Sequence, residues 1–244
     1  MLKSFSVTDI GKKRKLNQDF VYVSETPVGN LPNLFIVADG MGGHNAGDYA
    51  SKCAVETIVR EIRGCFEKNP VRIIGKALRV ANDFVRRKAR EDESLYGMGT
   101  TAVVATCMGH YLQVANVGDS RLYIINDEIR QITRDHSLVE EMIRMGGIDR
   151  EMAKHHPDKN IITRAIGGLD TLEIDFFNEE LKAGDLVLMC SDGLTNMLED
   201  GEISQIVKER ISIEDKAGKL IEAANDRGGK DNIAVILIDV FAKE

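Results

Sequence analysis

The rest of the sequence is interpreted around one stretch, which reads Leu34-Phe35-Ile36-Val37-Ala38-Asp39-Gly40-Met41-Gly42-Gly43-His44. Its first five residues are apolar, which is typical of a buried strand, and the apolar run ends in a carboxylate followed by glycines. Such a pattern places a charged oxygen ligand at the edge of a buried layer, with backbone carbonyls close by. The stretch therefore predicts a suitable place for a hard cation.

Acidic residues recur at comparable points elsewhere in the chain. The predicted strand ends and glycine-rich turns carry Asp19, Asp39, Asp119, Asp192 and Asp231. Carboxylates and carbonyls without a histidine or thiolate pattern suit Mg²⁺ or Mn²⁺ better than Zn²⁺. Two such ions about 3.5–4 Å apart can share a water and promote displacement at phosphorus. A single Asp-Gly pair is more often an ordinary turn, so this prediction requires the acidic positions to meet.

Composition indicates an ordinary globular chain and excludes several classes. The 244 residues are 43% hydrophobic and 29% charged, and we expect them to form a single domain. The net charge of −7 argues against nucleic-acid partners, although residues 12–15 are basic. Four scattered cysteines, no signal-peptide pattern and no membrane-length apolar run favour a reducing cytoplasm and no membrane partner.

The order of apolar patterns predicts the fold class. Expected helices lie at 50–62, 74–85, 138–145, 203–209 and 215–225. Expected strands lie within 4–23 and at 34–38, 100–108, 111–117, 121–126, 128–133, 172–177, 185–191 and 233–240. Residues 100–133 read as one antiparallel meander, and residues 138–168 as a flap over the site. Grouped strands and grouped helices favour an α+β layered fold over a doubly wound sheet.

Other phosphate and hydrolase motifs fit poorly. Gly40-Met41-Gly42 begins a dinucleotide-type loop, but Asn45 stands where the third glycine belongs, and no Gly-Lys-Ser/Thr occurs. The alternating acidic ligands of an EF-hand are absent. Cys190 is not followed by the Cys-x5-Arg loop of a cysteine phosphatase, and the serines lack a Gly-x-Ser-x-Gly elbow.

Two further residues are candidates for chemistry at a phosphate. Arg14 could bind two phosphate oxygens at once, although it also belongs to a basic run that water alone could solvate. His44 could donate a proton to the leaving oxygen because imidazole titrates near neutral pH, although a lone loop histidine is often only exposed.

Taken together and in order, these motifs resemble a known family. They are Gly11-x-x-Arg14-x-x-Asn17-Gln18-Asp19, Asp39-Gly40-Met41-Gly42-Gly43-His44, Gly99-Thr100-Thr101, Gly118-Asp119-Ser120, Asp135-His136-Ser137, Ser191-Asp192-Gly193 and Gly229-Lys230-Asp231-Asn232. The set resembles the bacterial branch of the metal-dependent Ser/Thr protein phosphatases, the protein phosphatase 2C class. The resemblance implies a four-layer α-β-β-α sandwich, with two central antiparallel β-sheets flanked by helices.

The same resemblance implies roles for individual residues. Asp39 would bridge two Mg²⁺ or Mn²⁺ ions, the Gly40 carbonyl would bind one of them, and Asp192 and Asp231 would hold the other. Asp19 would bind the metals through water.

Two more residues complete the implied site. Asp119 resembles the ligand of a third ion, and Arg14 matches the family's phosphate-binding arginine. The sequence departs from the family pattern at Met41, where eukaryotic members carry the proposed general-acid histidine, and His44 is the nearest substitute. It departs again at Ala234, where threonine is frequent.

The function implied by the resemblance is hydrolysis of phosphoserine and phosphothreonine in proteins. A water or hydroxide bridging the two ions would attack phosphorus, and the enzyme would counter a Ser/Thr kinase in the cytoplasm as a monomer. Two alternatives stay open: a regulatory phosphatase dedicated to one phosphoprotein, and an inactive scaffold of the same fold that binds phosphoproteins.

Overall fold

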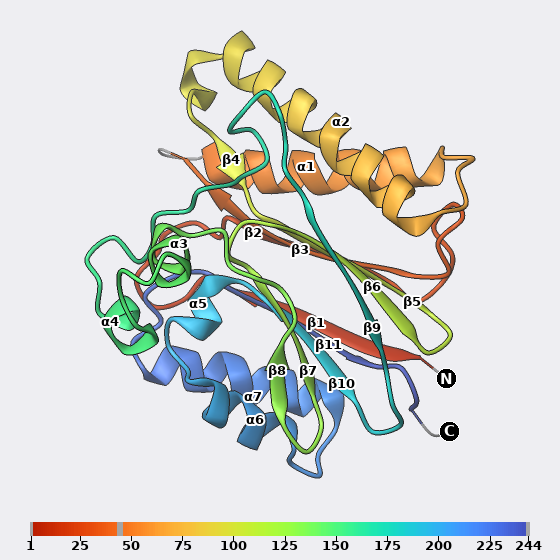
Figure 1. Ribbon diagram of the computed structural model, residues 1–244, viewed down its shortest axis with the longest axis vertical. Helices are drawn as coiled ribbons and strands as arrows, with labels where there is room; N and C mark the ends of the chain where they lie inside the picture. Colours follow the sequence, from red (N-terminus) through yellow and green to blue (C-terminus); the bar gives the residue numbers. More distant parts are fainter. Residues whose placement is uncertain (1, 43–45, 243–244) are drawn as a thin grey trace.

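In the computed structural model, two antiparallel sheets lie face to face with helices on both outer sides (Figure 1). The structure describes residues 2–42 and 46–242. One sheet has the order β1 (Lys3–Asp9), β11 (Ile233–Asp239), β10 (Leu186–Cys190), β7 (Arg121–Ile125) and β8 (Ile129–Gln131). The other has the order β2 (Asp19–Ser24), β3 (Leu34–Met41), β5 (Ala102–Met108), β6 (Tyr111–Val117) and β9 (Asp175–Glu180), and the short β4 (Gly99–Thr100) pairs with β3.

The helices form the two outer layers. The sheet that contains β3 is covered by α1 (Ala46–Arg63) and α2 (Pro70–Glu91), and the 3-10 turn η1 (Glu93–Leu95) follows α2. The other sheet is covered by α5 (Asp192–Thr195), α6 (Asp200–Val207) and α7 (Ile213–Asp226). The predicted α+β sandwich of four layers is therefore confirmed.

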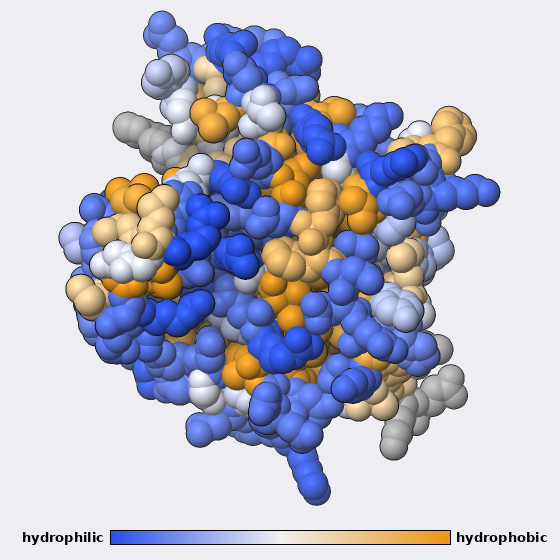
Figure 2. Space-filling view, viewed as in Figure 1, coloured by the Kyte–Doolittle hydropathy of each residue, from blue (hydrophilic) through white to orange (hydrophobic). Residues whose placement is uncertain are grey.

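Three apolar clusters correspond to the three interfaces between these layers. The sequence of β3 is apolar from Leu34 to Ala38 because alternate residues there are buried on opposite faces of the sheet. Phe35 and Val37 belong to the cluster between the sheets, whereas Leu34, Ile36 and Ala38 belong to the cluster under α1 and α2. A strand buried on both faces loses the polar alternation of a half-exposed strand. Hydrophilic side chains predominate on the face shown in Figure 2, where the layers are seen edge-on, with smaller apolar areas between them.

The outer helices begin and pack as their sequences predict. In α1, Ala50, Ala54, Ile58 and Ile62 recur at four-residue steps and are all buried. The helix α2 begins after Asn69, whose side chain accepts a hydrogen bond from the Arg72 backbone N–H. This cap lengthens α2 beyond the apolar pattern from which it was predicted.

The expected single meander at residues 100–133 is wrong in one respect. β5 pairs with β6 and β7 pairs with β8, but β6 and β7 belong to different sheets. The chain crosses between the sheets at Gly118, whose φ of 106° suits glycine and where a Cβ would meet Thr101. This crossing places Asp119 at one end of the sandwich.

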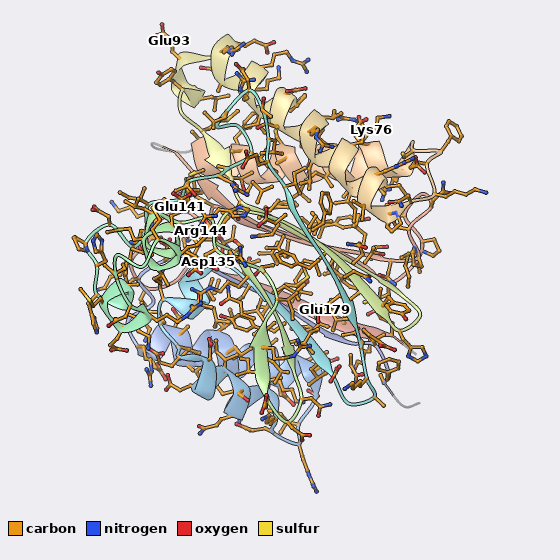
Figure 3. All side chains as sticks on the ribbon, in the orientation of Figure 1. Lys76, Glu93, Asp135, Glu141, Arg144 and Glu179 are labelled. Carbon is orange, nitrogen blue, oxygen red and sulfur yellow. The ribbon has the colours of Figure 1, made fainter. Side chains whose placement is uncertain are left out.

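The segment expected to form a flap contains two short helices, α3 (Leu138–Arg144) and α4 (Arg150–Lys154), at the left of Figure 1. Sequence predicted α3, whereas α4 was missed because five largely polar residues show no helical period. An ion pair of 2.9 Å joins Lys154 of α4 to Glu199 just before α6. In Figure 3, Asp135 lies just before this segment, and Glu141 and Arg144 lie on α3.

Within the described ranges, none of the helices combines the length and apolar character that crossing a bilayer requires.

Candidate metal and phosphate site

Six of the residues predicted for the site line one small cavity at the end of the sandwich. The cavity measures about 220 Å³, and its walls include Arg14, Asp39, Gly40, Asp119, Asp192 and Asp231. They come from the loop before β2, the end of β3, the crossing after β6, the start of α5 and the turn before β11. In an antiparallel pair, the end of one strand and the start of the next lie at the same edge of the sheet. Antiparallel pairing therefore brings these points together.

Asp19 lies beside this cavity and is buried deeper. It is the direct cross-strand partner of Asp39 in the β2–β3 pairing and is only 7% exposed. Its Oδ2 accepts a 2.6 Å hydrogen bond from the Ser191 hydroxyl, which itself accepts one of 2.8 Å from the Ala234 backbone N–H. Ser191 thus ties Asp19 on one sheet to the last strand of the other.

The backbone around Asp39 is fixed by two threonines. Its N–H donates to Thr101 Oγ1 at 2.9 Å, and its carbonyl accepts from Thr100 Oγ1 and from the Thr101 N–H, each at 2.9 Å. Thr101 Oγ1 also lies 2.8 Å from the Ser120 hydroxyl, beside Asp119. The two acidic positions are therefore connected through short polar side chains.

The two acidic residues contributed by the other sheet have different partners. Asp192 Oδ2 accepts at 2.9 Å from the amide of Asn196, the residue that directly follows α5. Asp231 Oδ2 accepts from the Arg14 guanidinium at 2.7 Å, so the predicted phosphate-binding arginine contacts a predicted metal ligand. The Asn232 side chain fixes the loop that carries Arg14, because its amide donates to the carbonyls of Ile10 and Leu16, each at 2.9 Å.

Two glycines allow the backbones at the site to approach this closely. A Cβ on Gly40 would collide with the Gly47 carbonyl at the start of α1, and one on Gly193 would collide with the Asn232 carbonyl. Glycine is therefore required for close packing at both positions, each of which directly follows an aspartate of the site.

Mutual repulsion and loss of hydration both act on the carboxyls. Burial is the largest cause that raises the pKa of Asp19 to about 7 and that of Asp119 to about 8, and neighbouring aspartates add to both shifts. The pKa values of Asp39 and Asp192 are also raised, first by burial and then by adjacent carboxylates. A cluster of this kind resists carrying its full negative charge without compensating cations.

The donor set fits a hard divalent cation. Oδ1 of Asp19 and Oδ1 of Asp192 are buried and have no hydrogen-bond partner among the described residues. All the predicted ligands offer oxygen, which Mg²⁺ and Mn²⁺ prefer. Over residues 2–42 and 46–242, no three Asp, Glu, His or Cys side chains are already grouped closely enough to hold an ion.

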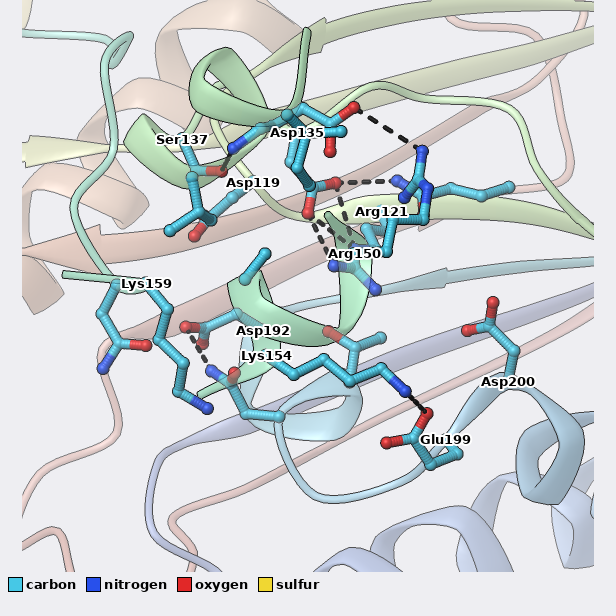
Figure 4. A pocket seen from close by; sticks show the side chains of 18 of the residues that line it. Asp119, Arg121, Asp135, Ser137, Arg150, Lys154, Lys159, Asp192, Glu199 and Asp200 are labelled. Carbon is cyan, nitrogen blue, oxygen red and sulfur yellow. Dashed lines mark hydrogen bonds and ion pairs between the residues drawn. The ribbon is translucent and has the colours of Figure 1, made fainter. Parts of the chain in front are cut away.

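A second, larger cavity of about 640 Å³ opens beside the first and shares Asp119 and Asp192 with it (Figure 4). On its wall, the half-buried Arg121 forms hydrogen bonds of 2.6 to 3.0 Å to both carboxylate oxygens of Asp135. Figure 4 also shows the Lys154–Glu199 pair at the opposite rim. The space lies between the expected flap and α5.

Sequence reasoning missed some residues that support the site. Thr101, Ser191 and Asn196 each form a hydrogen bond to an aspartate predicted for the site. Thr101 and Ser191 stand inside motifs that carry the resemblance, which gave them no role of their own, and Asn196 lies outside those motifs. His44, predicted as a proton donor, falls outside the described residues.

Comparison with known proteins places this geometry in a family. The family model described as Protein phosphatase 2C matches residues 11–227. A serine/threonine phosphatase stp of Listeria innocua is 40% identical over 95% of this chain and 93% of its own length. The S. agalactiae serine/threonine phosphatase structure is 38% identical and superimposes with a TM-score of 0.90, over 99% of this chain and all of the other.

A third relative carries metal. The catalytic domain of the serine threonine protein phosphatase PstP, solved in complex with two manganese ions, is 31% identical to this chain. The two superimpose with a TM-score of 0.86 over 99% of each chain. From the family match, the sequence identity and the shared fold, we conclude that this chain belongs to the protein phosphatase 2C family.

Proposed function

We propose that this protein hydrolyses phosphoserine and phosphothreonine in other proteins, using two Mn²⁺ or Mg²⁺ ions and thereby countering a Ser/Thr kinase. The observation that carries the proposal is the convergence of Asp39, Asp119, Asp192 and Asp231 on one cavity, with Arg14 beside them. Membership of the family and the stp and PhpP phosphatases of other bacteria support it.

The cations would be held by the predicted carboxylates. We assign the bridging position to Asp39, with the Gly40 carbonyl on one ion, Asp192 and Asp231 on the other, and Asp19 acting through water. Asp119 is assigned to a third ion. When bound, the ions supply Lewis-acid activation of water and neutralise the charge of the phosphate. Without such cations, the raised pKa values of Asp19 and Asp119 disfavour full ionisation.

Arg14 is proposed to bind the non-bridging phosphate oxygens. It contacts Asp231 through one terminal nitrogen, and its side chain is 48% exposed toward solvent. The other N–H groups of a guanidinium can form a planar, two-pronged contact with a phosphate. The Asp231 contact would then orient Arg14 toward a phosphate lying over the acidic cluster. We propose His44 as the proton donor to the leaving serine or threonine oxygen, on sequence grounds alone.

Release of inorganic phosphate from a phosphoserine peptide, with and without Mn²⁺, tests the proposal. We expect Mn²⁺-dependent release by the native chain and a loss of at least about 10³-fold in Asp192→Ala, since that change removes a predicted metal ligand. Asp83→Ala, at an exposed aspartate on α2, is the matched control and should keep the native rate. Equal rates for Asp192→Ala and the native chain would contradict the proposal.

The same assay separates the alternatives. A scaffold would bind the phosphopeptide without releasing phosphate, and a dedicated enzyme would act on one phosphoprotein far faster than on a panel of others. We further propose that residues 1–244 form one phosphatase domain with a flap at 138–168, which acts as a cytoplasmic monomer without nucleic-acid or membrane partners.

A further inference from the structure

His136 is a buried residue two positions before the flap segment (residues 138–168), and its ring touches the turn that carries Asp119. The side chain is 5% exposed. Its Nδ1 accepts a 3.1 Å hydrogen bond from the Gly118 backbone N–H, and its Nε2 lies 3.1 Å from Asp175 Oδ2 on β9. His136 and Gly118 are also joined through their backbones, because the His136 N–H donates to the Gly118 carbonyl at 3.0 Å. His136 therefore holds this turn from two sides.

These contacts fix the proton on the ring. Because Nδ1 faces a backbone N–H, it must offer its lone pair, so Nε2 carries the hydrogen and donates it to Asp175. Arg164 lies 3.2 Å from Nε2, but its nitrogen is also a donor and finds its acceptor in Asp175 Oδ1, at 3.0 Å. Burial lowers the pKa of His136, which agrees with a neutral ring.

The turn needs such support because it is where the chain leaves one sheet for the other. Gly118 has a left-handed φ of 106°, and its neighbour Asp119 lies on the walls of both cavities. On the other side of the turn, Asn116 donates to the Gly118 carbonyl at 3.2 Å. The Gly118 N–H bonds to the His136 ring, so the direction in which Asp119 leaves the turn depends on that ring.

We propose that His136, oriented by Asp175, is a positioning residue that holds the Gly118–Asp119 turn and thereby sets the affinity of the Asp119 end of the site for a divalent cation. The inference rests on the proposed function in one respect, since it takes the Asp119 carboxylate as a cation ligand. Outer-layer partners of metal ligands commonly change metal affinity by roughly 10–100-fold.

Two substitutions distinguish the roles of the two ring nitrogens of His136. In His136→Asn the amide oxygen takes the place of Nδ1 and can accept from the Gly118 N–H, whereas in His136→Gln the longer amide reaches the place of Nε2 and can donate to Asp175. A merely structural histidine would make both variants equally less stable and leave cation binding alone. His156→Gln is the matched control, because His156 is another histidine whose Nδ1 accepts a backbone N–H, in this case from Asp158 at 3.2 Å.

The experiment is a titration of each metal-free variant with Mn²⁺, with free Mn²⁺ followed by electron paramagnetic resonance and folding checked by circular dichroism. We expect His136→Gln to lose roughly 10–100-fold affinity at one class of Mn²⁺ site. His136→Asn should lose less than His136→Gln, because it keeps the acceptor for the Gly118 N–H and gives up only the contact with Asp175. The control His156→Gln should stay within about threefold of the native chain. Native affinity in folded His136→Gln, or an equal loss in His136→Asn, would overturn the proposal.

Asp175→Ala provides an independent variant if His136→Gln does not fold. It leaves the Nε2 hydrogen without its acceptor, and we expect about a tenfold loss at the same class of site. Unchanged Mn²⁺ binding there would also overturn the inference. Mn²⁺ binding is measured without substrate, so a native chain that releases no phosphate would count against the proposed function while leaving this result interpretable.

Discussion

Single hydroxyl groups do much of the positioning at the acidic site. Ser191 is the clearest case, because it donates to Asp19 and accepts from the Ala234 N–H, and all three groups are buried. Burial of polar groups is tolerated when they are paired and is costly when one partner is removed. The serine therefore stabilises an otherwise unfavourable carboxylate in the interior.

Ser191→Ala should lower the free energy of unfolding of the metal-free protein by about 1–3 kcal/mol, because it leaves the Ala234 N–H and Asp19 Oδ2 without their partner. Urea unfolding followed by circular dichroism measures the change. The control is Ser204→Ala on α6, a buried serine whose hydroxyl forms no side-chain hydrogen bond within the described part of the chain. It should be neutral or slightly stabilising; a Ser191→Ala loss no larger than that of the control would refute this role.

Among the helices and strands, the sequence predicted those whose formation depends on a local pattern of apolar residues. The apolar run before Asp39 is a strand because two layers cover it, and the four-residue steps of α1 place one face on the core. What it missed depends on contacts between distant segments. The crossing at Gly118 separates β6 from β7, and nothing within residues 100–133 indicates which sheet β7 will join.

The same limit applies to the site. Aspartates at strand ends and in glycine-rich turns marked the acidic positions, because several of them recur in the chain, although any one alone is more often an ordinary turn. The contact between Arg14 and Asp231, by contrast, spans 217 residues. The role of Asn196 depends on α5 beginning at Asp192, and that helix of four residues has no sequence period. Partners of the ligands are set by tertiary packing and so could not be predicted.

For the whole molecule, the clustered carboxyls link stability to pH. A carboxyl whose pKa is raised by folding binds its proton more tightly in the folded state, so stability rises as the pH falls through the raised value. Asp119, with a pKa of about 8, and Asp19, with a pKa of about 7, set the relevant range. Above that range both carboxyls are ionised, so the repulsion between them and the neighbouring carboxylates is greatest.

We therefore expect the metal-free protein to become more stable by about 2 kcal/mol between about pH 8.5 and about pH 7, measured by urea unfolding. Saturating Mn²⁺ should stabilise the protein more at the higher pH, because a cation requires ionised carboxylates. Greater stability of the metal-free protein at pH 8.5, or an equal effect of Mn²⁺ at both values, is the contrary result.

The central claim is that carboxylates from both sheets form one metal site at the end of the sandwich. Anomalous diffraction at the manganese absorption edge, from crystals grown with Mn²⁺, tests it most directly. The account predicts two strong peaks about 3.5–4 Å apart, in contact with Asp39, the Gly40 carbonyl, Asp192 and Asp231. Ordered manganese elsewhere, with these four residues left uncoordinated, would contradict it.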